Sequence, residues 1–97
     1  MIGIGTRICV KSSDREVFLA ATRSLVAAVR AESGCLSYAT YEDMEAANAF
    51  YFVGRYRDQA AVDAHIASAH VKTFMGALDG CKSSEPEGAF YDLPDPE

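Results

Sequence analysis

The chain has 97 residues, of which 49% are apolar and 24% are charged, and its 9 basic and 14 acidic residues give a formal net charge of −5. These values are typical of one globular domain and exclude an intrinsically disordered chain, which combines low hydrophobicity with high net charge. No apolar run approaches the roughly 20 residues of a membrane span. An acidic chain without clustered lysine and arginine also lacks the electrostatic footprint of a nucleic-acid binder.

The N-terminus and the cysteines predict a cytoplasmic protein. Residues 1–5 contain neither a basic segment nor a long apolar stretch, so we expect no signal peptide. The three cysteines, Cys9, Cys35 and Cys81, are odd in number and form no CxxC pair. We therefore expect free thiols, with no disulfide and no cysteine-based zinc site.

The first half of the chain predicts a strand, a helix and two more strands. Residues 2–11 alternate between apolar and small or polar side chains, which favours a strand. Ser13 and Glu16 fit a capping box, and Gly34 fits a C′ glycine, so we expect a helix over about 14–33. Strands are expected at 35–42 and 49–57. The last of these is apolar on both faces, and the helices can cover only one face, so the other predicts a partner subunit.

The second half predicts two short helices and a final strand. Asp58 is a natural N-cap for a helix over residues 59–66, and Ser68 for a second helix that ends at Gly80. Residues 89–91 fit a short strand. The order β-α-β-β-α-β predicts an α+β, ferredoxin-like split βαβ fold, with a four-stranded antiparallel sheet and helices on one face. We expect a single domain over residues 1–93 and a C-terminal tail over 94–97.

His65 and His70 are the two histidines of the chain. They lie five residues apart, whereas a helical zinc pair prefers a spacing of four with a third ligand nearby, so we expect no metal site. His65 shares a helix face with Val62 and Ile66 and is a candidate general base, since imidazole titrates near neutral pH. From the spacing alone, a buried, hydrogen-bonded core histidine is the favoured interpretation.

Tyrosines and arginines supply the remaining candidates. Tyr56 ends the third strand beside the short helices, where a phenol can hydrogen-bond a ligand while its ring packs against it. The alternative for the tyrosines is ordinary strand packing. Arg7, Arg55 and Arg57 could hold an anionic substrate or pair with acidic residues across an interface.

Two segments resemble the antibiotic biosynthesis monooxygenase family. One is Glu32-Ser33-Gly34-Cys35-Leu36-Ser37-Tyr38, where the family often has E-x-G-C-L-x-Y. The other runs from Asp58 through His65, Ser68 and His70 to Phe74, which follows the family's D-x-x-A-x-x-x-H-x-x-S-x-H-x-x-x-F pattern. The resemblance implies a dimeric α+β barrel, formed by two ferredoxin-like units that pack sheet against sheet.

The same resemblance implies a monooxygenase without a cofactor. Such relatives use a base and dioxygen to oxidise a small aromatic substrate, which is hydroquinone- or anthrone-like. The implied catalytic residues are His65 as the base, with Tyr56 and His70 orienting the substrate. The residues that we expect to contact the substrate are Tyr41, Phe52, Arg57 and Phe74.

Departures from the family pattern keep other functions open. Many relatives end the third strand as E-x-W-x-D, whereas this chain has Gly54 and Tyr56 in place of the Glu and Trp. A tyrosine here resembles relatives that isomerise a small phosphorylated dione in autoinducer processing. The alternatives are therefore such an isomerase or a non-catalytic ligand-binding dimer. Haem-degrading relatives carry an Asn on the first strand and a His in the last helix; residues 2–11 lack the first and residues 71–78 the second.

Overall fold

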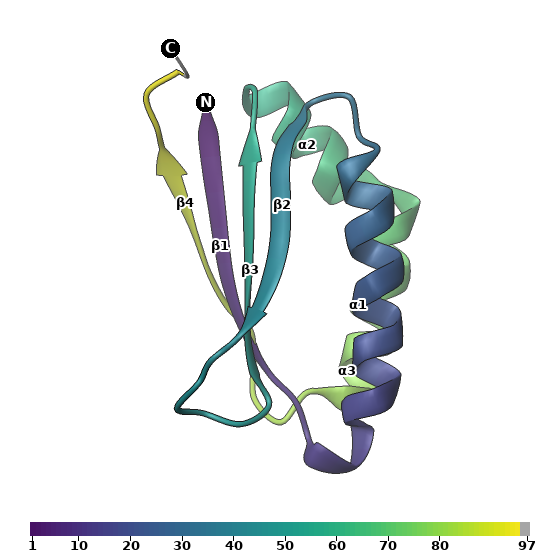
Figure 1. Ribbon diagram of the computed structural model, residues 1–97. Coiled ribbons are helices and arrows are strands. Elements are labelled where there is room, and N and C mark those ends of the chain that lie inside the picture. The colour runs from purple at the N-terminus through teal and green to yellow at the C-terminus, as the bar shows by residue number, and fades with distance from the viewer. Residues whose placement is uncertain (96–97) are drawn as a thin grey trace.

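The computed structural model describes residues 1–95, and these form one α+β unit (Figure 1). In chain order, the elements are β1 (Ile2–Cys9), α1 (Arg15–Arg30), β2 (Cys35–Glu42), β3 (Ala49–Tyr56), α2 (Gln59–Ala67), α3 (Ala69–Cys81) and β4 (Glu87–Asp92). A short 3-10 turn at Ser12–Asp14 precedes α1. The predicted order of strands and helices is confirmed.

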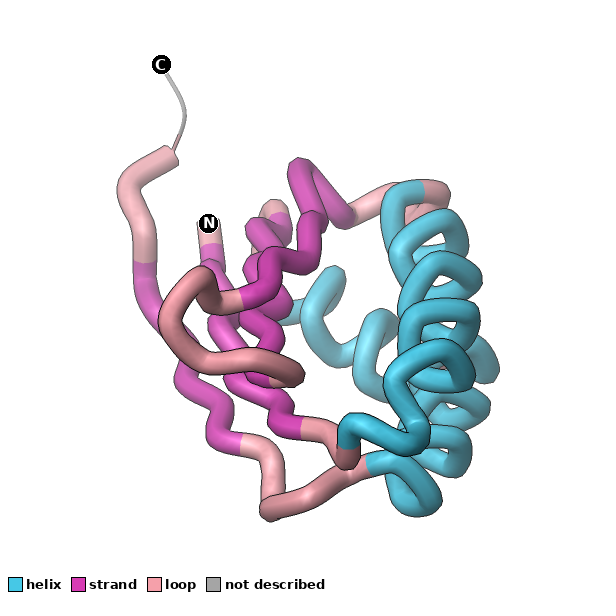
Figure 2. Tube along the Cα trace, turned by 60° about the horizontal axis from the view of Figure 1, so that its bottom comes forward, coloured by secondary structure: helices cyan, strands magenta, loops and turns pink. Residues whose placement is uncertain are grey.

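The four strands form one antiparallel sheet in the order β2-β3-β1-β4. All three helices lie on one face of this sheet, so the described residues form two layers (Figure 2). This is the ferredoxin-like arrangement that the sequence predicts. It places the end of α1 and the junction between α2 and α3 at the same end of the sheet (Figure 1).

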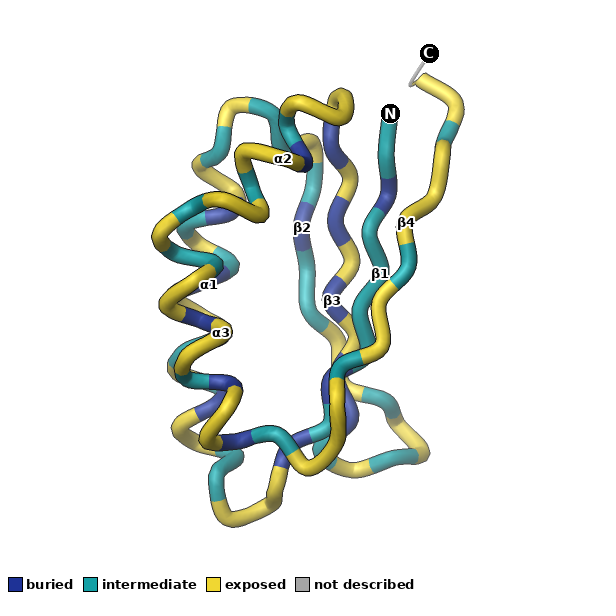
Figure 3. The backbone as a smooth tube through the Cα atoms, turned by 180° about the vertical axis from the view of Figure 1, so that it is seen from behind, coloured by how far each residue is buried: buried dark blue, intermediate teal, exposed yellow. Residues whose placement is uncertain are grey.

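The core lies between the two layers, and β3 contributes to it through every second side chain. Phe50, Phe52 and Tyr56 are buried on the side of the helices, whereas Tyr51 and Val53 are exposed on the opposite face. Buried and exposed positions therefore alternate along β3 (Figure 3). Four phenylalanine rings from α1, β3 and α3 pack together, with ring centroids 4.9–6.1 Å apart: Phe18, Phe50, Phe52 and Phe74. Such aromatic clusters bury large areas and hold the helices on the sheet.

The opposite face of the sheet is open and carries large apolar side chains. Tyr41, Tyr51, Val53 and Tyr91 are 37–61% exposed there. Register pairs Tyr41 with Tyr51 across β2 and β3, so their rings share this face. No element among residues 1–95 covers it. An exposed apolar surface of this kind is typical of an interaction surface.

Both predicted ends of the first helix are wrong in detail. Ser13 lies in the 3-10 turn, where the Asp14 amide bonds the Lys11 carbonyl, so α1 begins at Arg15 without the capping box. Gly34 has no positive φ and is not a C′ glycine. Instead, a Cβ at Gly34 would lie 2.3 Å from the Ala61 Cβ. Glycine is required here because α2 approaches the loop after α1 closely.

The two ends of the described chain lie side by side at one end of the sheet (Figure 1). The Met1 amine donates to the Leu93 carbonyl at 3.1 Å and pairs with Asp95 at 2.9 Å. Of the predicted tail at 94–97, Pro94 and Asp95 are irregular, and 96–97 lie outside the described residues. No helix in the described part of the chain is long and apolar enough to cross a membrane.

Candidate functional site

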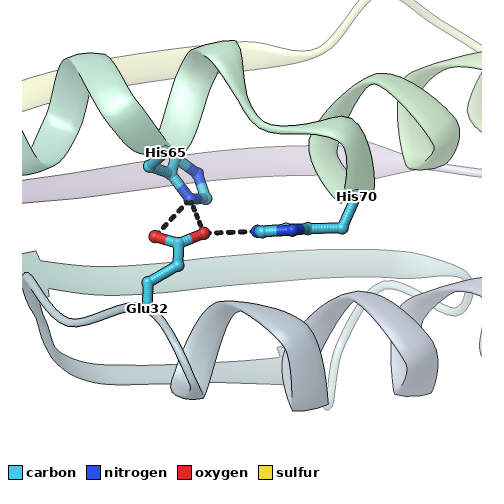
Figure 4. Close-up of side chains that lie close together, drawn as sticks. All are labelled: Glu32, His65 and His70. Carbon is cyan, nitrogen blue, oxygen red and sulfur yellow. Dashed lines mark hydrogen bonds and ion pairs between the residues drawn. The ribbon is translucent and has the colours of Figure 1, made fainter.

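Three side chains from distant parts of the sequence meet at the α2–α3 junction (Figure 4). The Nδ1 atom of His65 lies 3.0 and 3.2 Å from the two carboxylate oxygens of Glu32, and the Nε2 atom of His70 lies 2.5 Å from Oε2. A carboxylate oxygen only accepts hydrogen bonds, so both nitrogens carry the bonded protons. We call these three residues the Glu32 cluster.

The break between α2 and α3 brings the two histidines together. Ser68 has an extended ψ of 151° and ends α2 while it caps α3. Its hydroxyl donates to the His65 carbonyl at 2.6 Å and accepts from the Val71 amide at 3.3 Å. On one continuous helix, residues five apart would point about 140° away from each other. The break at Ser68 therefore lets His65 and His70 reach the same carboxylate.

Glu32 lies just after the end of α1, where the chain turns toward β2. Its amide donates to the Val29 carbonyl at 3.0 Å. Two residues later, the Gly34 carbonyl accepts from the Arg57 amide at 3.0 Å, and α2 packs against Gly34 through Ala61. These contacts hold the Glu32 loop against the start of α2, and so hold the carboxylate opposite His65.

The cluster is shielded but reachable from solvent. The side chains of His65, Glu32 and His70 are 11%, 15% and 29% exposed. Two grooves adjoin them. One, of about 320 Å³, lies between α1 and α3 and is lined by His70 and Phe74. The other, of about 440 Å³, is lined by Glu32 and Arg57. One groove therefore exposes His70 and the other exposes Glu32, whereas His65 lines neither.

Two buried tyrosines lie beside His65. The His65 ring centroid is 5.0 Å from that of Tyr56 and 6.0 Å from that of Tyr38. Burial, reinforced by nearby negative groups such as Glu32, raises the pKa of both phenols well above the ordinary value of 10.0. Both phenols therefore stay protonated and can donate. The Tyr56 hydroxyl is fully buried and has no hydrogen-bond partner within residues 1–95.

The structure brings some predicted site residues together and separates others. His65, His70 and Tyr56 gather around Glu32 and the neighbouring core. Phe52 and Phe74 belong to the aromatic core, although Phe74 also lines the α1–α3 groove. Arg57 lines the other groove, and its guanidinium donates to the Ser33 carbonyl at 2.7 Å. Tyr41 lies on the open face of the sheet, 61% exposed, and does not face the cluster.

Glu32 is a member of the candidate site that the sequence did not predict. It appears in the Glu32-to-Tyr38 motif, but nothing in its local pattern indicates a histidine partner more than thirty residues away. The one signal was the motif itself, in which Glu32 stands two residues before Gly34, a position that has no room for a side chain beside Ala61. The three ligand atoms lie within 4.8 Å of one another, so this donor set could also hold a metal ion.

Cys35 follows the loop but shows no sign of nucleophile chemistry. Burial is the main cause that raises the pKa of its thiol, and the negative charge of Glu32 adds to it. A thiol with a raised pKa is mostly protonated and inert at neutral pH. All three cysteines are free, as the sequence predicts.

The family model described as antibiotic biosynthesis monooxygenase matches residues 1–77, which include every member of the Glu32 cluster. The chain belongs to this family. A Bacillus subtilis protein named "Putative monooxygenase YcnE" is 36% identical over 75 residues, which cover 77% of this chain and 79% of that protein. The Synechocystis protein sll1783, described as uncharacterized, is 34% identical over 74 residues. The match covers 76% of this chain and half of that longer protein.

Solved structures share the fold of this chain. The crystal structure of an antibiotic biosynthesis monooxygenase superposes with a TM-score of 0.91 at 23% identity, over 98% of this chain and all of that one. A conserved protein from Methanosarcina mazei superposes with a TM-score of 0.89 at 27% identity, over 93% of this chain and 89% of that one. The first likeness shows the fold. Family membership and the name of the Bacillus relative support a general monooxygenase-like function.

Proposed function

We propose that this member of the antibiotic biosynthesis monooxygenase family oxidises a small, electron-rich aromatic with dioxygen and without a cofactor. The observation that carries the proposal is the Glu32–His65 pair beside the buried, unpartnered phenol of Tyr56. A carboxylate that holds Nδ1–H of a histidine fixes its tautomer and leaves Nε2 as the basic atom. His65 is thus equipped to remove a proton from a substrate.

The chemistry balances without any redox group of the protein. For an anthrone-like substrate, His65 Nε2 takes a proton from the ring CH₂ and leaves an enolate. The enolate gives electrons to dioxygen and forms a C–O bond, which yields a peroxide. Loss of the second C–H proton breaks the O–O bond, so the products are a ketone and one water. Tyr56 donates a hydrogen bond to the developing oxyanion, a contribution that is strong in a buried site.

The proposal includes a homodimer in the cytoplasm. The open sheet face carries Tyr41, Tyr51, Val53 and Tyr91, and a second copy offers the same apolar surface. Sheet-to-sheet packing of two copies would bury these side chains and close a barrel. In such an assembly Tyr41 lies at the interface. It would contact the substrate only if the substrate site extended from the Glu32 cluster to the open face of the sheet.

A second candidate is an isomerase that acts on a small anionic substrate. Arg57 favours it, because it lines the same groove as Glu32 and a guanidinium holds anions well. An isomerase also needs a base, and His65 would serve. The two candidates differ in oxygen use, since only the monooxygenase consumes one dioxygen per product.

The test is oxygen uptake with a panel of hydroquinones and anthrones, followed by the His65→Ala variant. A positioned base contributes about 10²–10⁴-fold, so we expect turnover to fall by at least about 10²-fold. The thermal midpoint is measured on the same sample. A folded His65→Ala protein with unchanged turnover would contradict the assignment of the base. No oxygen uptake with any member of the panel would favour the isomerase.

A further inference from the structure

We propose that Glu32, His65 and His70 form a binding site for a divalent transition-metal ion of the zinc type, each supplying one ligand. Oε2 of Glu32 lies 3.0 Å from His65 Nδ1 and 2.5 Å from His70 Nε2, and the three ligand atoms lie within 4.8 Å of one another. In a tetrahedral site with bonds of about 2.0–2.1 Å, ligand atoms lie roughly 3.3 Å apart. Small side-chain rotations therefore suffice to enclose an ion.

The chemistry of the donor set matches such an ion. Two imidazoles and one carboxylate form a ligand set that zinc accepts at sites with an open position. The hydrogen bonds do not oppose binding strongly. A neutral imidazole can carry its proton on the other ring nitrogen, so Nδ1 of His65 and Nε2 of His70 become free to bind the ion. The negative charge of Glu32 then faces the cation directly.

The surroundings support the site in two ways. The backbone that carries both histidines is fixed by the Ser68 hydroxyl, which bonds the His65 carbonyl and the Val71 amide. Ligands held in this way lose little freedom on binding. The grooves next to His70 and next to Glu32 provide an entry path and room for a water in the fourth position.

The five-residue spacing of His65 and His70 does not exclude a metal site in this fold. The two histidines lie on different helices because the chain breaks at Ser68, and Glu32 supplies the third ligand. Among residues 1–95 this is the one group of three potential ligands that lie close enough together. The Cys35 thiol is not a member.

Metal binding stands independently of the proposed oxidation. Its consequence for turnover does rest on that function, because an ion on Nδ1 leaves the imidazole proton on Nε2, so that Nε2 can no longer accept a proton from the substrate. Zinc would then inhibit the enzyme. Binding itself can be measured on protein that has no known substrate.

The experiment titrates chelator-treated protein with Zn²⁺ by calorimetry and with Co²⁺ by visible absorption. We expect one ion per chain and a cobalt spectrum of low coordination number without thiolate charge transfer. Glu32→Gln, His65→Ala and His70→Ala should each weaken binding by at least about tenfold, the lower figure for outer-shell partners of a metal. Asp63→Asn and Cys35→Ser are matched controls that should bind as the parent protein does.

Circular dichroism establishes that each variant is folded. If His65→Ala does not fold, Glu32→Gln and the more exposed His70→Ala decide the question. Absence of binding to the folded parent protein would overturn the proposal. So would binding that survives in Glu32→Gln and His70→Ala, or that disappears in Cys35→Ser, since the ligands would then be others. Loss of oxygen uptake in the metal-free parent protein would contradict the proposed function and leave the metal site intact.

Discussion

Substituting Gly34 by alanine tests how α2 is held against the site. The added Cβ would lie 2.3 Å from the Ala61 Cβ and 3.2 Å from the Ala61 Cα. Carbon atoms pack at about 3.5–4.0 Å, so the two methyl groups would overlap by more than about 1 Å. Because both Cβ atoms are fixed by the backbone, no rotamer change relieves the overlap. The helix or the loop must move.

The expected loss of stability follows from two opposing effects. Overpacking costs about 1–3 kcal/mol. Replacing glycine by alanine restricts the unfolded chain and returns about 0.4–1 kcal/mol. We expect the free energy of unfolding to fall by about 1–2 kcal/mol, measured by urea unfolding at a fixed protein concentration. The slope against urea should stay unchanged, since the surface exposed on unfolding stays the same.

A double-mutant cycle with Ala61→Gly separates the contact from a backbone effect. Ala61→Gly alone should cost about 1 kcal/mol, the ordinary cost of glycine in a helix. Combined with Gly34→Ala, it removes the overlap between the two Cβ atoms and leaves only the 3.2 Å approach to the residue-61 Cα, so the two substitutions together should cost less than their sum by about 1 kcal/mol or more. A Gly34→Ala protein as stable as the parent would refute the reasoning. Strictly additive costs would instead indicate a requirement for the glycine backbone, as a C′ glycine has.

Two further predictions concern the open sheet face and the ion pair between the start of α1 and the end of β2. Sedimentation equilibrium at micromolar concentration should give a dimer with an interface of about 1,600 Å² or more, and Val53→Asp should give monomers; a monomeric parent protein would contradict the proposed assembly. The bidentate hydrogen bonds from Arg15 lower the pKa of Glu42 from 4.5 to about 2. This pair therefore stabilises the fold above pH 4.5, and its contribution is lost as the pH falls through about 2. The stability difference between the parent and Arg15→Ala should shrink over that range in acid unfolding curves; a constant difference would show that the pair does not titrate in this way.

The strands and the fold class were predictable from the sequence because the alternation of residues in each strand reflects which of its faces is buried. The alternation of Ile2, Ile4 and Ile8 on β1 marks a face that packs on helices, and the structure confirms it. The two apolar faces of β3 likewise predicted an uncovered surface, which the structure shows at Tyr51 and Val53. Period-two patterns are local, and burial on one side is enough to produce them.

The helix ends were less predictable because several local solutions compete there. Ser13 and Glu16 fit a capping box, yet a 3-10 turn satisfies the Asp14 amide and moves the helix start to Arg15. Gly34 fits a C′ position, but its real constraint is the methyl group of Ala61, twenty-seven residues later. A glycine that makes room for a neighbour looks the same in a sequence as one that adopts a positive φ.

The candidate site also could not be predicted from local patterns, because its residues are far apart in the sequence. His65 and His70 were identified individually, and their spacing argued against cooperation on one helix. The capping role of Ser68 was also predicted, and a cap in mid-sequence means that the two histidines belong to different helices. Once the helix is divided, their mutual direction is set by the angle between α2 and α3, which packing decides. Glu32 enters through a third element, and its carboxylate joins both imidazoles. The chemistry of the site therefore depends on contacts between three segments that no local pattern relates. Ser68, which ends α2 and caps α3, is the one feature of the sequence that indicates where these segments come together.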